Sequence, residues 1–206
     1  IFVLLEDKRF LSVSLDSISK QTFSSYEILI MAKTLTEEEK SLFSYYKKMP
    51  ISIYLEDQAY LGKTLNLGLE KAKGSYVQFF LQGDLYLWPK ALEEIHEILV
   101  SEKPDLFCSA SLIRKDRYPK AVSSEAFIEG LKNGTMRAHI NTMLFEKSLF
   151  SRFFGFNESI KHYPGFDFFI KILRNPSVKV FLGKKVYVDQ DLEANIRNYH
   201  FRELLD

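Results

Sequence analysis

The hydrophobic positions of this chain follow two patterns that alternate along its first half. Short continuous apolar runs predict buried strands, and apolar residues spaced by three or four positions predict amphipathic helices. Four strand–helix units in succession are typical of an α/β fold with a parallel, doubly wound sheet. The predicted strands are residues 1–5, 26–31, 51–56, 76–81 and 105–112, and the predicted helices are 10–19, 36–48, 61–73 and 89–101.

Residues with strong positional preferences support several of these boundaries. Thr36 is a favoured N-cap and is followed by three glutamates, which suit the positive end of a helix. Pro50 ends the same helix, and Gly74 is the favoured residue just beyond the next one. Pro89 fits the first turn of the fourth helix.

After Arg114 the regular alternation is lost. Helices are predicted at residues 125–131, 146–153 and 166–175, and strands at 139–145, 178–183 and 185–189. No repeat, low-complexity segment or linker interrupts the chain. We therefore expect one domain over residues 1–206, with a regular half at 1–112 and a more irregular half at 113–206.

Composition narrows the possible classes of protein. The 206 residues include 28 basic and 27 acidic side chains, and this near-balance gives no support for nucleic acid as a partner. The single cysteine, Cys108, excludes an intrachain disulfide and suits a reducing compartment. No apolar run has the length of a membrane span and no signal peptide is visible, so we expect a cytoplasmic protein, with membrane association left to a partner.

Four segments resemble the motifs of family 2 glycosyltransferases, in the same order and with the same spacing. They are "FLSVSLDSISKQTFSSYEILIM", "LGKTLNLGLEKAKGSYVQFF", "GDLYLWPKALE" and "FGFNESIKHYPGFDFFIKI". The resemblance covers nearly the whole chain. It implies a GT-A fold, in which helices flank a mixed, mainly parallel sheet.

The resemblance also implies an activity. Members of the family transfer a sugar from a nucleotide-sugar donor to an acceptor, here a glycan or a lipid-linked molecule, and invert the anomeric carbon. Surface polysaccharide biosynthesis is the expected setting. On this basis residues 1–112 form the nucleotide-binding half and residues 113–206 form the acceptor-side half.

The predicted strand ends suggest where a donor binds. Open parallel sheets bind nucleotides at the carboxyl ends of their strands, so the residues that follow each strand line one crevice. Glu6 follows the first strand and Lys33 the second, and both are expected to contact the donor. Asn66 is added to this set because it belongs to the family motif. The other residues at strand ends are Asp7, Ala32, Glu56, Asp57 and the Gln82–Asp84 triplet.

The second strand departs from the family pattern. The family has "V-D-D-G-S" there, whose acids help to hold the donor's base, whereas this chain has Ala32 and Lys33. Neither side chain accepts a hydrogen bond from a uracil N–H. We expect weak uridine selectivity or another base, with Lys33 acting as a point charge on phosphate.

The family's D-x-D triplet, which holds a divalent cation on the donor's diphosphate, is also changed. This chain has Gln82-Gly83-Asp84. Asp84 matches the usual direct ligand, so the resemblance implies a Mn²⁺ or Mg²⁺ site on Asp84, with Gln82 offering a neutral oxygen. In the competing interpretation Asp84 only caps the turn before the helix that follows. A literal D-x-D, Asp189-Gln190-Asp191, is read mainly as a solvated loop.

Asp167 is the candidate base. The family has an acidic pair at the start of a helix, and here the pair reads Phe166-Asp167. A carboxylate partly desolvated by neighbouring phenylalanines suits general-base work. Asp167 also fits the role of an N-cap after Pro164-Gly165.

Other classes remain to be compared. The changed motif positions favour a catalytically inactive GT-A protein that acts as a binding or assembly partner. A nucleotidyltransferase usually has a glycine-rich phosphate loop after the first strand, and "LLEDKRF" contains no glycine. A dinucleotide-binding dehydrogenase is excluded because no G-x-G-x-x-G follows an early strand.

Overall fold

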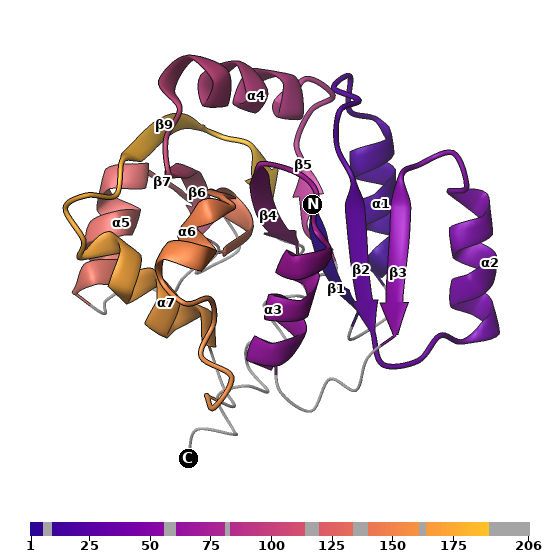
Figure 1. Cartoon of the computed structure of the whole chain (residues 1–206). Helices are drawn as coiled ribbons and strands as arrows, with labels where there is room; N and C mark the ends of the chain where they lie inside the picture. Colours follow the sequence, from indigo (N-terminus) through magenta and orange to yellow (C-terminus); the bar gives the residue numbers. More distant parts are fainter. Residues whose placement is uncertain are drawn as a thin grey trace.

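A computed structural model describes residues 1–5, 10–55, 61–80, 83–113, 120–133, 140–160 and 164–189 (Figure 1). Two predicted donor-site residues, Glu6 and Gln82, lie outside the described residues, as do Asp7, Glu56, Asp57 and Asp191.

The first half has the predicted strand–helix alternation. Strands β1 (Phe2–Leu5), β2 (Ile28–Ala32), β3 (Ile51–Leu55) and β4 (Tyr76–Phe80) pair in parallel, in the order β3-β2-β1-β4. Helices α1 (Leu11–Ser19), α2 (Glu37–Tyr45) and α3 (Leu61–Lys71) connect these strands, and α4 (Ala91–Glu102) follows β4. Strands β2 and β4 both lie at inner positions of the sheet.

Thr36 is the N-cap of α2, as predicted. Its side chain accepts the Glu39 backbone N–H at 3.3 Å, and the Glu39 carboxylate accepts the Thr36 N–H at 2.6 Å. This reciprocal capping box satisfies two of the backbone donors that a helix start leaves unpaired.

The second half extends the same sheet and makes it mixed. Strand β8 (Met143–Glu146) pairs antiparallel with β4, and β6 (Leu106–Ile113) pairs antiparallel with β8 and with β7 (Lys120–Val122). Strand β9 (Val180–Val186) pairs in parallel with β6. The other elements are α5 (Ser124–Lys132), the 3₁₀ helix η2 (Ile140–Thr142), α6 (Ser148–Arg152) and α7 (Pro164–Leu173).

Two predictions for this half need correction. The strand predicted at 139–145 begins only at Met143, because Ile140–Thr142 form η2. The strands predicted at 178–183 and 185–189 have different bounds, since β9 continues to Val186 through a register irregularity opposite Cys108 and Ala110. Strand β10 (Val188–Asp189) then pairs antiparallel with β5 (Leu85–Tyr86) in a separate two-stranded sheet.

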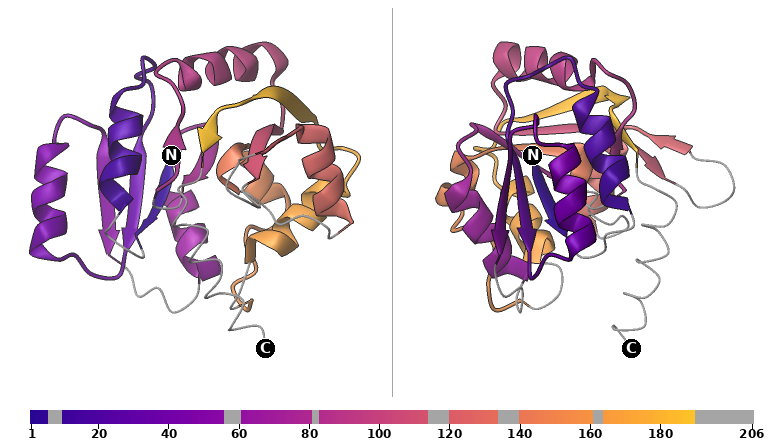
Figure 2. Two further views of the ribbon diagram at one scale, coloured as in Figure 1. Left: turned by 180° about the vertical axis from the view of Figure 1, so that it is seen from behind. Right: turned by 90° about the vertical axis from the view of Figure 1, so that its right-hand side faces the viewer.

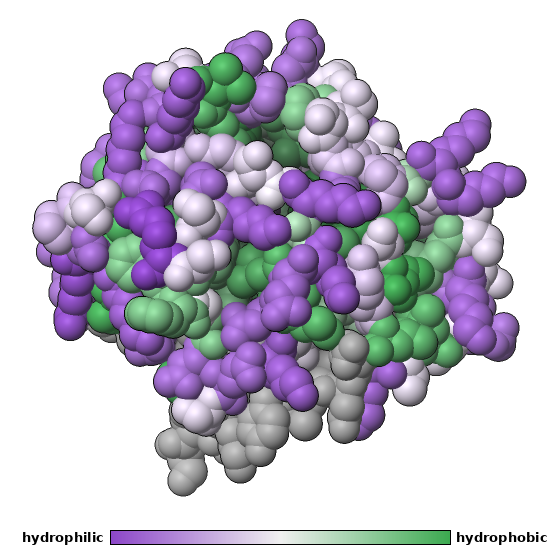
Figure 3. Space-filling view, viewed as in Figure 1, coloured by the Kyte–Doolittle hydropathy of each residue, from purple (hydrophilic) through white to green (hydrophobic). Residues whose placement is uncertain are grey.

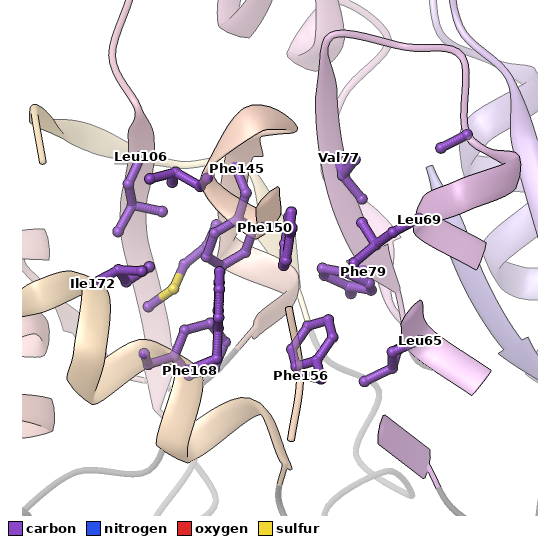
Figure 4. Packing of buried hydrophobic residues seen from close by; sticks show 14 of the residues in the cluster. Leu65, Leu69, Val77, Phe79, Leu106, Phe145, Phe150, Phe156, Phe168 and Ile172 are labelled. Carbon is purple, nitrogen blue, oxygen red and sulfur yellow. The ribbon is translucent and has the colours of Figure 1, made fainter. Parts of the chain in front are cut away.

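Both faces of the sheet are covered by helices, and the side chains of β2 and β4 alternate between two cores. Ile28 and Phe80 face the core formed with α1 and α4. Leu29 and Phe79 face the core formed with α3, α6 and α7. Figure 4 shows this second core, in which the Phe150 and Phe168 rings stack with their centroids 4.6 Å apart. The layers are seen from behind and from the side in Figure 2.

The single cysteine lies inside the protein, and most of the visible surface is hydrophilic. Cys108 is fully buried in the α3–α6–α7 core, and burial raises the pKa of its thiol to about 12. The face shown in Figure 3 is dominated by hydrophilic side chains with smaller hydrophobic patches between them. Among the described helices, none is both long enough and apolar enough to cross a membrane.

Candidate active site

The carboxyl ends of the parallel strands lie at one edge of the sheet, which is the lower edge in Figure 1. Gly83 and Asp84 follow β4 at this edge, directly before β5. Gly83 has φ +91°, a backbone conformation that residues other than glycine rarely adopt. Only 1% of Asp84 is exposed. The chain therefore turns at Gly83 and carries a buried carboxylate at the expected end of β4.

Helix α1 holds the backbone on both sides of Asp84. The Ser14 hydroxyl accepts the Gly83 N–H at 3.0 Å, and the Ser17 hydroxyl accepts the Tyr86 N–H at 3.2 Å. The Tyr86 hydroxyl donates to Gln78 Oε1 at 2.5 Å inside the protein. Burial raises the pKa of Tyr86 well above its ordinary value, so this hydroxyl stays protonated.

Asp189 lies beside the same segment, which corrects its interpretation as a solvated loop. In the β5–β10 pair Asp189 is opposite Leu85, the residue after Asp84. It is partly buried, and it follows the buried residues Tyr187 and Val188. The apolar pattern of "KVYVD" did predict a strand that ends at Asp189. The sequence had no signal for its partner, because β5 has only two residues.

Lys33 lies at the expected edge, immediately after β2, and its side chain is exposed. Ala32 is the last residue of β2 and is fully buried, so it belongs to the strand and not to the loop after it. Lys33 places a positive charge of the kind that suits a phosphate at this edge, and the buried Ala32 side chain offers no hydrogen bond to a nucleobase.

Asn66 lies in α3 and contacts protein groups on both sides of its amide. Its oxygen accepts the Phe156 N–H at 2.9 Å, and its nitrogen donates to the Phe156 carbonyl and to Glu158 Oε1, each at 2.9 Å. Gly155 has φ +65°, and a Cβ there would lie 2.7 Å from Asn66 Oδ1. Asn66 thus ties α3 to the segment that precedes α7, and its contact with a donor stays a prediction.

Asp167 lies in the first turn of α7. Because α7 begins at Pro164, the N-cap interpretation of Asp167 is wrong. Its side chain is 34% exposed, and its Oδ2 lies 2.6 Å from Lys171 Nζ. The next residues, Phe168 and Phe169, point into the core, and this packing orients the turn that carries Asp167.

The described side chains limit the kind of metal site that the protein can form. Across the described ranges, no group of three or more His, Cys, Asp or Glu side chains could hold a metal ion. The hard oxygen of one buried carboxylate, Asp84, suits Mg²⁺ or Mn²⁺ when phosphate oxygens supply further ligands. Asp84 therefore fits a cation that arrives with a diphosphate, and not a cation held by the protein alone.

A cavity of about 450 Å³ lies at the opposite edge of the sheet. It is bounded by residues that precede the strands, such as Glu27 and Ser75, and by the α4 side chains Ile95 and Leu99. Since open parallel sheets bind ligands at their carboxyl edge, this cavity is not part of the candidate site.

Solved structures that are similar to this fold include glycosyltransferases. S. aureus TarS (residues 1–349) superposes with a TM-score of 0.74 at 15% identity, over 96% of this chain and 61% of TarS. TarS in complex with UDP-GlcNAc gives a TM-score of 0.72 at 17% identity, over 91% and 56%. The mannosyltransferase PcManGT from Pyrobaculum calidifontis, in complex with GDP-Man and Mn²⁺, gives 0.67 at 14% identity, over 92% and 55%.

This chain has a GT-A-type glycosyltransferase fold. The fold class predicted from the sequence is confirmed.

Two proteins named as uncharacterised glycosyltransferases are similar in sequence to this GT-A chain. The one from Rickettsia typhi is 26% identical in an alignment of 185 positions that covers 80% of this chain and 55% of that protein. The one from Rickettsia prowazekii is 24% identical in an alignment of 200 positions that covers 86% of this chain and 60% of that protein. No family model matches the chain. The chain thus spans little more than half the length of these relatives. The resemblance to glycosyltransferases is confirmed, and membership of family 2 stays a prediction.

Proposed function

We propose that this chain transfers a sugar from a nucleotide-sugar donor to a glycan or lipid-linked acceptor, in the synthesis of a polysaccharide. One observation carries the proposal. A buried aspartate, Asp84, follows β4 at the carboxyl edge of a parallel sheet whose structural neighbours include complexes with UDP-GlcNAc and with GDP-Man and Mn²⁺. This edge is where open α/β sheets bind nucleotides.

Asp84 and Lys33 have complementary roles in donor binding. Asp84 would hold Mn²⁺ or Mg²⁺ through its carboxylate, and a cation bound there would supply stabilisation of the charge on the leaving diphosphate. Lys33, exposed at the end of β2, adds a positive charge toward the phosphates. Asp189, beside Leu85, adds negative charge to the same edge.

Asp167 acts as the base. It accepts the proton of the acceptor hydroxyl while that oxygen bonds to the anomeric carbon and the bond from this carbon to the diphosphate oxygen breaks. Attack from the side opposite the leaving group inverts the anomeric configuration. The Lys171 ammonium lies 2.6 Å from Asp167 Oδ2 and orients this carboxylate across one turn of α7.

A catalytically inactive binding or assembly partner is the second candidate. It is favoured by the exposed Lys33 and buried Ala32 where the family has acids, and by the neutral Gln82 of the triplet. Such a protein keeps the sheet edge but lacks the groups that hold the donor. The Rickettsia relatives do not separate the two candidates, since both are uncharacterised.

A binding and turnover screen tests the proposal. We expect UDP, GDP and their sugar conjugates to bind more tightly with Mn²⁺ than without it, and at least one donor to be hydrolysed or transferred. Asp84→Asn should remove the Mn²⁺-dependent part of binding. Glu102→Gln, at the exposed end of α4, is the matched control and should change nothing. Metal-dependent binding without turnover would support the inactive partner, and no nucleotide binding at all would overturn both candidates.

A further inference from the structure

A row of three polar residues, two on helix α1 and one just beyond its end, serves a single segment of the chain. Ser14 and Ser17 are spaced by three residues, which places them on the same side of the helix, and Gln21 follows the C-cap Lys20. All three hydrogen-bond to residues between Gly83 and Leu92. The neighbouring side of α1, with Leu11, Leu15 and Ile18, is buried in the core formed with α4.

The first two residues of the row bracket Asp84. The Gly83 N–H, on the residue before Asp84, donates to Ser14 Oγ, and both residues are buried. The Tyr86 N–H, two residues after Asp84, donates to Ser17 Oγ. The Ser17 hydroxyl proton is directed to the Ser14 carbonyl at 2.8 Å, which leaves the Ser17 oxygen to accept.

The third residue and its neighbour hold the far end of the segment. The Gln21 amide nitrogen donates to the Trp88 carbonyl at 3.0 Å, and its oxygen accepts the Leu92 N–H at 3.0 Å. The Thr22 N–H donates to the Pro89 carbonyl at 2.8 Å. The path from Gly83 to the start of α4 is therefore held by α1 and by the two residues that follow its C-cap.

The contacts at Gly83 and Tyr86 differ in kind from an ordinary helix–strand packing contact. Both acceptors are side-chain hydroxyls, and both donors are backbone groups at an irregular turn, where the left-handed Gly83 has no strand partner to fix its peptide. Because Asp84 lies between these two peptides, the two hydrogen bonds constrain the backbone from which its carboxylate projects.

We propose that Ser14 and Ser17 are positioning residues for the Asp84 carboxylate, so that α1 sets where the donor's diphosphate and its cation bind. This inference rests on the proposed function of Asp84. Ser14 and Ser17 do not touch the donor, and they act through the backbone at Gly83 and Tyr86. Loss of either hydroxyl leaves a buried N–H without its acceptor and lets the turn move.

Two measurements on Ser14→Ala and Ser17→Ala in the 206-residue chain test this proposal. The first is amide hydrogen exchange over residues 83–92, with overall stability followed by urea unfolding. The second is the affinity for Mn²⁺ together with UDP or GDP, measured in the wild type and in Asp84→Asn. Ser19→Ala is the matched control, because Ser19 lies on the same helix, is exposed, and its hydroxyl donates to the Asp16 carbonyl within that helix. Ser17→Thr keeps a hydroxyl and serves as the rescue.

We expect exchange at Gly83 and Tyr86 to rise in the two alanine variants and to stay unchanged in Ser19→Ala and Ser17→Thr. Binding with Mn²⁺ should weaken roughly ten- to a hundredfold, as a small displacement of a binding group typically causes. In the Asp84→Asn background the same serine substitutions should have no further effect, because they act through Asp84.

Each result that would contradict these expectations has a different meaning. If exchange at 83–86 matches that of Ser19→Ala, the serines do not hold the turn and the proposal is overturned. Equal losses of affinity with and without Asp84 would assign the serines to general stability and would overturn it as well. If the wild type binds neither nucleotide with Mn²⁺, the proposed function of Asp84 fails, and the exchange data still decide whether α1 holds the turn.

Discussion

The Asp167 carboxylate and the Lys171 ammonium form an ion pair of 2.6 Å across one turn of α7. Both side chains are partly exposed, with 34% and 46% of their surfaces accessible. An exposed pair of this kind contributes only about 0–1 kcal/mol to the free energy of unfolding. The pair therefore adds little to stability, and its main consequence is that the Asp167 carboxylate is held next to Lys171 on one side of α7.

Asp167→Asn should lower turnover and leave the fold intact. We expect the rate of sugar transfer to fall by roughly a hundredfold to ten-thousandfold, the usual contribution of a general base. Donor affinity and the urea midpoint should stay close to those of the wild type. Lys171→Met is the control for the ion pair, since it keeps the carboxylate. Equal turnover in Asp167→Asn and the wild type would exclude Asp167 as the base.

The residues at the end of β2 predict how strongly the protein discriminates between the nucleobases of its donors. Because Ala32 is buried and Lys33 is exposed, we expect UDP and GDP to bind with affinities within about tenfold of each other, a difference of roughly 1.4 kcal/mol. Lys33→Met should weaken both to the same extent, since its charge acts on phosphate. Calorimetry that found tight, uracil-specific binding unaffected by Lys33→Met would contradict this interpretation.

The contact between Asn66 and Gly155 predicts a stability coupling. Asn66→Ala removes three hydrogen bonds to residues 156 and 158 and should cost about 1–3 kcal/mol of unfolding free energy. Gly155→Ala adds a left-handed alanine, at roughly 1–2 kcal/mol, and places a Cβ 2.7 Å from Asn66 Oδ1.

Urea unfolding of the double mutant checks this coupling. In the Asn66→Ala background the overlap with the new Cβ is gone and only the backbone cost of Gly155→Ala remains. The double mutant should therefore lose less unfolding free energy than the two single mutants lose together. Strict additivity would show that the Asn66 side chain is not what constrains Gly155.

Alkaline pH should destabilise the protein through two buried acids. Burial raises the pKa of the Cys108 thiol from 9.0 to about 12 and raises that of Tyr86 well above 10.0. A raised pKa in the folded state means that the protonated form is favoured there. Its contribution to stability is therefore complete below the unfolded pKa and declines as pH rises through the window up to the folded pKa.

We expect the unfolding free energy to fall from about pH 9 upward, where an unfolded cysteine begins to ionise. Cys108→Ala should flatten the first part of this decline between pH 9 and 12, when its slope is compared with that of the wild type. An identical slope in both proteins would mean that the thiol is not buried in solution.

Local signals made most of the fold predictable, and pairings between distant short segments did not. The signals in Thr36, in Gly74 and in the apolar runs of β2 and β4 each lie within a short stretch of sequence. The elements that they mark are predicted to within a few residues of their bounds. The pair formed by β5 and β10 joins Tyr86 to Val188, and two-residue strands leave no periodic pattern.

The sequence predicts where the candidate site lies better than it predicts the hydrogen bonds within it. The strand ends predicted that Asp84 and Lys33 lie at the carboxyl edge, and both do. The contacts of Ser14 and Ser17 were missed, because a serine on an amphipathic helix gives no signal in the sequence of the distant backbone N–H groups that donate to it. Asn66 was assigned from a motif alone, and its contacts with Phe156 depend on tertiary packing.

The central claim is that the Asp84 carboxylate binds the cation on the donor's diphosphate. The most direct measurement is a Mn²⁺ titration, in the presence of UDP or GDP, of the wild type, Asp84→Asn and Gln82→Asp, followed by donor hydrolysis. Asp84→Asn is nearly isosteric, so it should abolish metal-dependent binding and lower turnover by about a hundredfold to a thousandfold without unfolding the protein. Gln82→Asp should bind Mn²⁺ more tightly than the wild type. Equal Mn²⁺ affinity in all three proteins would contradict the claim and leave the non-catalytic partner as the better account.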